Sequence, residues 1–429
     1  MSLQPTDGPE IEQGQRGRRD RLGDAAFDYY MPLELVRGEG VYLFDSAGQR
    51  YLDMYNNLPS VGHGHPEVVS AIAAQSATLN TNSRYLNKTM EAYAARLLRL
   101  FPAPLGNLVM TCSGSEANDL ALRIACAATG RKGIIVTAGA CHGSTAAAIE
   151  VSPGLRERLP AHVRAIPAPD QRLAGQTALG SWFAARVYEQ VQALREAGFG
   201  LAALVVDSAF AADGVFTDPP GFLAEAVGVV RTAGGLFIAD EVMAGFGRTG
   251  ALWGFSRHGV VPDLVTLGKP MGNGYPTGGV VAQDQHLACL EDAVFHFNPS
   301  GGTSVAAAAG MAVLDVIENK NLVRNSVRVG QALRKGLRRL AKSFPQIAAV
   351  RGAGLLTGVD LVARASGAPD AEMSRRAVNA LRQNFILAGT AGPRRHALQF
   401  RPPLTFAADH VAQFLDIFAR VLATLGQAG

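Results

Sequence analysis

Two oppositely charged residues follow apolar, strand-like runs in the middle of the chain. Asp240 ends the run LFIAD, and Lys269 follows the run DLVTLG. The carboxyl ends of parallel strands face the crevice in which such folds bind ligands, so an acid and an amine are expected there together. Burial lowers the pKa of a lysine and suits it to act as a Schiff-base nucleophile. The alternatives are a lysine that reaches the surface from a strand end and an acid that caps a turn.

A third polar segment precedes the clearest helical pattern in the sequence. Ser113, Gly114 and Ser115 are followed by apolar residues at helical spacing, and Gly130 marks the end of that pattern. Backbone N–H groups and the dipole at a helix start bind anions; simple capping, with Glu116 in the first turn, is the alternative. Pyridoxal 5′-phosphate (PLP) requires a phosphate site, a lysine and an acid that keeps its pyridine nitrogen protonated. The coincidence of all three predicts a PLP site.

Three longer motifs carry a family resemblance. SGSEANDLALRIA, DEVMAGFGRTG and TLGKPMGNGYPTGGV resemble the signatures of the class III (ornithine/ω-amino acid type) aminotransferases, which have PLP fold type I. The similarity extends from an N-terminal hairpin through VGHGHPEV to QFRPPL and covers nearly the whole chain. It implies that Lys269 is the Schiff-base lysine, that Asp240 contacts the ring nitrogen and that Val242 packs on the ring. It places Gly114 and Ser115 at the phosphate. It also implies a homodimer with active sites at the subunit interface.

The sequence departs from the family pattern near the cofactor. Cys141, in ACHGST, replaces an aromatic residue that stacks on the cofactor, and we expect its thiol or His142 to fill the space. Such a stack contributes about 1 kcal/mol. Met243 replaces a glutamine after the ring-packing valine, which removes a hydrogen-bond donor.

A further departure lies in PSGGTS, at residues 299–304. The resemblance implies a threonine here that donates to the cofactor phosphate of the neighbouring subunit. Pro299 stands at that position and has no donor. Thr303 or Ser300 is expected to take over the contact.

The substrate end of the expected site is altered as well. Many family members have an arginine before the F-x-P-P-L motif, which binds a substrate carboxylate and is shielded by a glutamate. Gln399 and Asp207 stand at these two positions. A bidentate arginine clamp is strong and specific, so the glutamate/2-oxoglutarate site is expected to differ here. Arg401, Arg394 and Arg395 are candidates to compensate.

The segment NTNSRYL, at residues 80–86, resembles the alanine–glyoxylate aminotransferase-like subgroup, which includes phospholyases. Arg84 is a candidate ligand for a substrate phosphate. The alternative is a surface arginine at a helix start.

The leading hypothesis is a PLP-dependent aminotransferase that moves an amino group from an amine or amino acid to a keto acid. Lys269 would carry a proton between the substrate carbon and the cofactor. A phospholyase that expels phosphate from an amino-alcohol phosphate is the alternative, because one scaffold hosts several chemistries. Racemisation also stays open. A relative that has lost catalysis is the third hypothesis, although the presence of both Lys269 and Asp240 argues against it.

Strands and helices alternate through the middle of the chain. Strands are predicted at residues 108–111, 133–137, 202–207, 236–239, 264–267 and 279–282. This order indicates an α/β fold with a mostly parallel, seven-stranded-type sheet covered by helices. The pattern further predicts a hairpin at 38–54 and long helices from 303 to 342. We expect a large PLP-binding domain at 56–322, and a small α+β domain built from residues 1–55 and 323–429.

Composition argues against several other classes of protein. The chain has 429 residues, of which 48% are hydrophobic, and a net charge of only +4. Its one basic run, RGRRDR at residues 16–21, has no aromatic neighbours, so we expect no nucleic-acid partner. No apolar run suffices to span a membrane, and no secretory signal is visible. The four cysteines lack metal-ligand spacing, which predicts no metal site and a cytoplasmic location.

Overall fold

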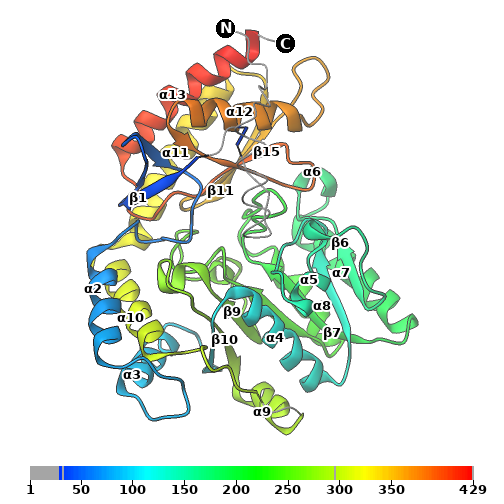
Figure 1. Ribbon diagram of the computed structural model, residues 1–429. Coiled ribbons are helices and arrows are strands. Elements are labelled where there is room, and N and C mark those ends of the chain that lie inside the picture. Colours follow the sequence, from blue (N-terminus) through cyan, green and yellow to red (C-terminus); the bar gives the residue numbers. More distant parts are fainter. Residues whose placement is uncertain (1–28, 31–32, 294–295, 428–429) are drawn as a thin grey trace.

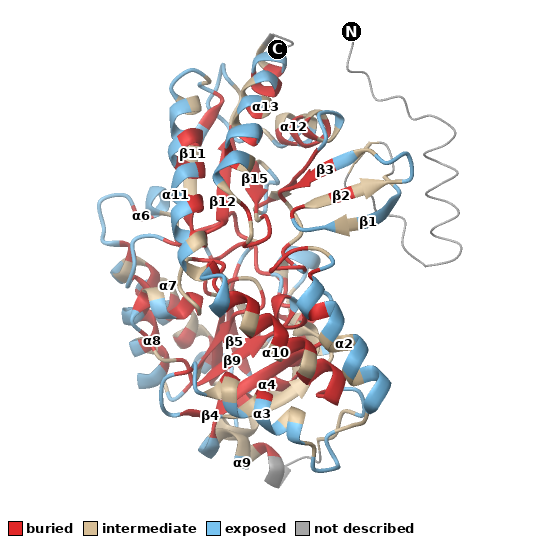
Figure 2. Cartoon of the chain, turned by 90° about the vertical axis from the view of Figure 1, so that its left-hand side faces the viewer, coloured by how far each residue is buried: buried red, intermediate tan, exposed pale blue. Residues whose placement is uncertain are grey.

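The structure is a computed structural model that describes residues 29–30, 33–293 and 296–427. The basic run at 16–21 lies outside these residues. Figure 1 shows two regions: a large sheet flanked by helices, and a second region that combines the blue N-terminal strands with the orange and red C-terminal elements. Buried residues concentrate in the large sheet and, in the second region, in β12 (Leu356–Leu361) and β15 (Ala397–Phe400) (Figure 2).

The large sheet has seven strands in the order β4-β10-β9-β8-β7-β5-β6. The strands are β4 (Leu105–Thr111), β5 (Gly133–Thr137), β6 (Val163–Ile166), β7 (Leu201–Asp207), β8 (Leu236–Asp240), β9 (Leu264–Leu267) and β10 (Gly278–Gln283). All run parallel except β10, which pairs antiparallel with both β4 and β9. The predicted mostly parallel sheet is confirmed. Its inner strands are apolar throughout because helices cover both faces.

The prediction missed only β6 among these strands. This four-residue strand, VRAI, pairs with β5 alone at the edge of the sheet. It is short and contains Arg164, which is half-buried, so it lacks the continuous apolar run of its neighbours.

The helices follow the order that the sequence indicates. They are α2 (Pro66–Thr78), α3 (Lys88–Leu98), α4 (Gly114–Thr129), α5 (Ala146–Glu150), α6 (Gln171–Ala174), α7 (Leu179–Glu196), α8 (Leu223–Thr232), α9 (Asp284–Ala293), α10 (Ser304–Asn319), α11 (Leu322–Ala341), α12 (Ala371–Gln383) and α13 (Ala408–Gln427). The long helical stretch is confirmed as α10 and α11, with a break at Asn321, which has a positive φ of 50°. No helix in the described part of the chain is both long and apolar enough to cross a membrane.

Helix α4 starts and stops where its sequence predicts. The Ser113 hydroxyl accepts the N–H of Glu116 at the N-terminus, and Gly130 ends the helix with a left-handed φ of 65°. Its apolar face is buried against β7, β9 and β10. The sheet therefore fixes the direction in which the helix start points.

Two smaller sheets complete the fold. One has the order β1-β2-β3-β13, with β1 (Leu35–Glu39), β2 (Tyr42–Asp45), β3 (Arg50–Asp53) and β13 (Ile386–Leu387); the other has the order β11-β12-β15-β14, with β11 (Ile347–Ala353), β12 (Leu356–Leu361), β14 (Gly389–Ala391) and β15 (Ala397–Phe400). The predicted hairpin is confirmed as β2 and β3. Because β13 pairs with β3, strands from the two ends of the chain share one sheet. The boundaries at 55/56 and 322/323 remain our proposal.

Helix α10 offers a test of packing. A Cβ at Gly310 would lie 2.4 Å from Cζ of Tyr93, a fully buried residue of α3. We expect Gly310→Ala to destabilise the protein by about 1–3 kcal/mol through overpacking. The matched control is Gly228→Ala in α8, where nothing lies within 4 Å of an added Cβ; it should stabilise by about 0.4–1 kcal/mol. Urea unfolding midpoints measure both, and equal midpoints for the two variants would contradict the packing.

Candidate active site

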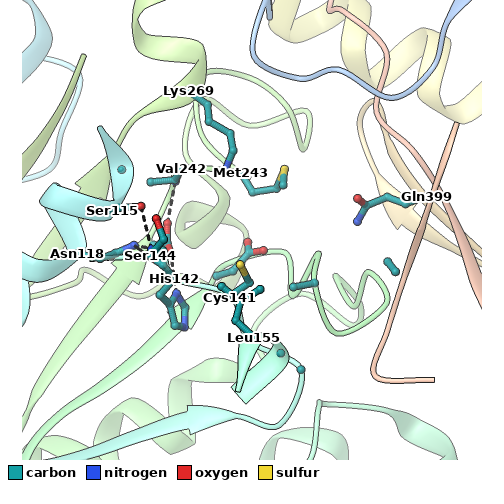
Figure 3. Close-up of a pocket in the computed structure, with 18 of the residues that line it drawn as sticks. Ser115, Asn118, Cys141, His142, Ser144, Leu155, Val242, Met243, Lys269 and Gln399 are labelled. Carbon is teal, nitrogen blue, oxygen red and sulfur yellow. Dashed lines mark hydrogen bonds and ion pairs between the residues drawn. The ribbon is translucent and has the colours of Figure 1, made fainter. Parts of the chain in front are cut away.

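A cavity of about 780 Å³ opens at the carboxyl ends of the large sheet's strands. Residues 390–401 and the segment around Tyr55 form its other walls. Figure 3 shows Lys269 entering from the top of the view and Gln399 from the right. The candidates Thr303, Ser300, Arg84 and Arg394 do not line this cavity. The other predicted site residues do: Ser113, Gly114, Ser115, Cys141, His142, Asp207, Asp240, Val242, Met243, Lys269, Arg395, Gln399 and Arg401.

Asp240 is the last residue of β8 and is buried at the base of the cavity. One carboxylate oxygen accepts the N–H of Val242 at 3.0 Å, and the other lies 2.7 Å from Nδ1 of His142. Burial alone would raise the pKa of Asp240. The hydrogen bond and charge of His142, together with the Val242 N–H, outweigh burial and leave this pKa below its usual value. The carboxylate therefore stays ionised without being exposed to water.

Asn118 completes the support of Asp240 and was not predicted from the sequence. Its Nδ2 donates to Asp240 at 2.9 Å and to the backbone carbonyl of His142 at 2.7 Å, while its Oδ1 accepts the hydroxyl of Thr266 at 2.7 Å. The signal was present: Asn118 is a polar residue on the buried, otherwise apolar face of α4. A buried amide on such a face needs partners, and here those partners are the site.

Lys269 follows β9 and starts a 3₁₀ turn, Lys269–Gly272. Its φ of 29° lies in the left-handed region, which is strained for a residue with a side chain. The residue is exposed, and its side chain lines the cavity. Desolvation lowers its pKa; the negative charge of Asp240 raises it, and the positive charge of Arg401 lowers it further. The net shift is downward, which favours the neutral, nucleophilic amine.

The loop from Ser113 to Ser115 is enclosed by close backbone contacts. A Cβ at Gly114 would lie 2.8 Å from a methyl group of Val242, and one at Gly268 would lie 2.9 Å from the Gly114 backbone. The Ser115 hydroxyl accepts the N–H of Ser144 at 3.2 Å. The Ser113 hydroxyl caps α4, so the capping alternative holds for that side chain, while the N–H groups at the helix start remain suited to an anion.

The residues present fit PLP. The start of α4 suits the cofactor phosphate, because Gly114 and Gly268 pack too closely there for side chains. The ionised Asp240 suits the pyridine nitrogen. The reactive carbon of PLP suits Lys269, which lines the same cavity.

Cys141 and Met243, which depart from the family pattern, both line the cavity. Burial raises the pKa of the Cys141 thiol, so Cys141 offers a small neutral group in place of an aromatic face. His142 holds Asp240, a role that the sequence did not suggest. The sulfur of Met243 accepts the side-chain amide of Asn57.

At the substrate end, Gln399 and Asp207 do not touch directly. The Asp207 carboxylate accepts the N–H groups of Ala209 at 3.0 Å and Ala211 at 2.8 Å. Gln399 donates to the carbonyl of Ala211 at 2.8 Å and accepts from Arg401. Burial, followed by the charge of Asp240, raises the pKa of Asp207 to about 6.

Arg84, Thr303, Ser300 and Arg394 lie outside the cavity of their own chain. The exposed Arg84 guanidinium stacks 3.9 Å from the ring centre of Phe297. Thr303 caps α10 by accepting the N–H of Ala306, and Pro299 and Ser300 are exposed in the loop before it. Their assignment to a phosphate in a neighbouring subunit stays a prediction.

Comparison with known proteins agrees with this geometry. The family model "Aminotransferase class-III" matches residues 25–422. The chain belongs to the class III aminotransferase family. Its cofactor is therefore PLP, and the predicted fold type I is confirmed by solved relatives. The cytoplasmic location stays a prediction.

Individual relatives of this class III protein carry different activities in their names. It is 37% identical over 428 residues to "Alanine--glyoxylate aminotransferase 2-like" of Drosophila melanogaster, covering 96% of this chain and 87% of the relative. It is 33% identical over 441 residues to "Ethanolamine-phosphate phospho-lyase homolog 1" of Caenorhabditis elegans, covering 97% and 94%. The solved phospholyase from Arthrobacter, in complex with phosphoethanolamine, is 38% identical, with a TM-score of 0.91 over 95% of this chain and 99% of that one.

The charges around Lys269 predict opposite effects of two substitutions. Arg401→Gln removes a positive charge that lowers the pKa of Lys269, so this pKa should rise; Asp240→Asn removes a negative charge that raises it, so it should fall. PLP binding by the cofactor-free class III enzyme is followed by visible absorbance at a series of pH values. The midpoint of this pH dependence reports the pKa of Lys269. Shifts of both variants in the same direction would rule out this electrostatic account.

Proposed function

We propose that this protein is a PLP-dependent phospho-lyase that releases inorganic phosphate from an amino-alcohol phosphate such as phosphoethanolamine. The sequence favours transamination as the leading hypothesis, and the substrate end of the cavity supports the phospho-lyase alternative. Gln399, at the position of the carboxylate-binding arginine, uses both ends of its amide within the protein. This is the observation that carries the proposal, because phosphoethanolamine has no carboxylate to bind.

Cations suited to a phosphate line the cavity instead. Arg401 and Arg395 both border it, together with Lys269. Guanidinium groups bind phosphate oxygens strongly, often in a bidentate manner. The 38% identity to a phospholyase solved with phosphoethanolamine supports the same substrate class.

The reaction needs only one substrate and water. Bound PLP supplies an electron sink for negative charge on the carbon next to the substrate nitrogen. Lys269, with its lowered pKa, takes the proton from that carbon. The C–O bond to phosphate then breaks with its electron pair leaving on the phosphate, whose charge Arg401 offsets. The remaining two-carbon enamine takes up a proton to become an imine, which water hydrolyses to acetaldehyde and ammonia. The products are therefore acetaldehyde, ammonia and inorganic phosphate in equal amounts.

The family's aminotransferase activity is the second candidate. The Drosophila relative's name and the family match favour it. A transaminase, however, must also bind a keto acid, and its carboxylate would have to use Arg401 or Arg395 rather than the usual clamp.

The deciding measurement supplies the holoenzyme with phosphoethanolamine and no keto acid. We expect phosphate, acetaldehyde and ammonia in a 1:1:1 ratio over many turnovers, because elimination regenerates the enzyme. Lys269→Ala should lower the rate by roughly 10²–10⁴-fold, whereas Lys132→Ala, at an exposed site, should leave it unchanged. Bleaching of the visible absorbance by L-alanine, restored by a keto acid, without phosphate release would instead establish a transaminase.

We also propose that the enzyme is a homodimer in which Arg84 serves the neighbouring site. Arg84 does not line the cavity of its own chain. The residues next to it, Tyr85 and Leu86, are 68% and 97% exposed, which is unusual for apolar side chains of this size and suits a covered surface.

Subunit complementation tests this arrangement. Co-expressed Lys269→Ala and Arg84→Ala chains form mixed dimers in which one site carries both lesions and the other carries neither. If Arg84 acts across the interface, mixed dimers should recover about half of the wild-type activity per dimer, although each parent is impaired. Mixed dimers no more active than the Arg84→Ala parent would place Arg84 in its own chain's site or outside catalysis.

A further inference from the structure

The amide of Gln399 is fully engaged although it borders the cavity. The residue is 2% exposed and belongs to β15, which pairs with β12 on one side and β14 on the other. Its Nε2 donates to the carbonyl of Ala211 at 2.8 Å, and its Oε1 accepts from Nη1 of Arg401. Figure 3 shows the amide directed toward the cavity from the right of the view.

The anchor of this amide is itself fixed. The N–H of Ala211 donates to the half-buried carboxylate of Asp207 at 2.8 Å. A continuous set of hydrogen bonds therefore runs from the end of β7 through Ala211 to Gln399 and on to Arg401. It connects the large sheet to the C-terminal wall of the cavity.

Arg401 is held on three sides. Its Nε donates to the carbonyl of Tyr55 at 2.5 Å, its Nη1 donates to Gln399, and its guanidinium lies 4.2 Å from the centre of the Tyr55 ring. Among the described residues, no protein acceptor contacts Nη2. No carboxylate pairs with Arg401 in that part of the chain either, so its charge is not offset.

Glutamine is the residue type that suits this position. An arginine at residue 399 would have no acceptor for Arg401 and would repel it. A glutamate would accept from Arg401 but neutralise it, and could not donate to Ala211. A glutamine accepts from Arg401 and donates to Ala211 at once, and leaves the positive charge of Arg401 available.

We propose that Gln399 is a positioning residue that fixes Arg401, so that the free edge of the Arg401 guanidinium binds the phosphate group of the substrate. The family's carboxylate ligand is thereby exchanged for an arginine two residues further along the chain. This inference rests on the proposed function for the identity of the substrate, but not for the binding of phosphate itself.

The test is a double-mutant cycle on phosphate affinity. Inorganic phosphate is titrated into the holoenzyme by calorimetry for wild type, Gln399→Met, Arg401→Gln and the double variant. Losing one hydrogen bond to a charged group should weaken phosphate binding about tenfold in Gln399→Met. In the Arg401→Gln background the same change should alter affinity less than about twofold, because Gln399 then has nothing to position. The KM for phosphoethanolamine should rise in parallel, with kcat little changed.

Gln346 provides the matched control. It is also a buried glutamine, 3% exposed, and donates to a backbone carbonyl, that of Leu422, away from the cavity. Gln346→Met should leave phosphate affinity at the wild-type value. Gln399→Glu should weaken binding more than Gln399→Met, because it neutralises Arg401.

The outcomes separate this inference from the proposed function. Additive losses in the cycle, an unchanged affinity in Gln399→Met, or a wild-type holoenzyme that binds no phosphate would each overturn the positioning role. If the cycle shows the expected coupling but phosphoethanolamine yields no phosphate, the positioning role stands and the proposed reaction is wrong. If phosphoethanolamine is consumed but the losses are additive, only the positioning role is wrong.

Discussion

The site depends on a carboxylate that stays ionised although it is buried. Burial by itself favours the neutral acid, and an isolated charge at this depth would be costly. At Asp240 that cost is offset by His142, Asn118 and the Val242 N–H. An ionised carboxylate only accepts hydrogen bonds, so Nδ1 of His142 must carry a proton and donate it to Asp240. The remaining groups of the cavity are arranged around a fixed negative charge.

Close packing at the edge of the sheet positions the residues on either side of it. Gly114, Gly268 and Val242 approach one another closely. A side chain at Gly114 would displace the methyl groups of Val242, and one at Gly268 would displace the Gly114 backbone. Lys269 follows directly and adopts a strained backbone conformation. Strain of this kind persists only where the surroundings hold it. The Ser113–Ser115 loop and the lysine are therefore positioned by one packed unit rather than by two independent loops.

The substrate end follows a different principle from the cofactor end. At the cofactor end, the Asp240 carboxylate is buried and paired with His142; at the substrate end, no carboxylate among the described residues pairs with Arg401. A paired site holds a permanent group, whereas an unpaired cation is available for an anion that arrives and leaves. A protein that combines the two can retain its cofactor and still exchange an anionic substrate or product.

Most strand positions and the main candidate site residues were predictable from the sequence alone, because their signals are local. Apolar runs that end in charged residues predicted Lys269 and Asp240, and small residues before a helix start predicted the loop at Ser113–Ser115. Strand positions followed from the same runs, except for the short edge strand β6. The tertiary structure alone decided what those residues contact. Asn118 meets Asp240 across 122 positions of sequence, and Gln399 meets Ala211 across 188. Such pairs depend on how the sheets and helices pack, which no local pattern records, and they determine which charges in the cavity are satisfied and which remain free.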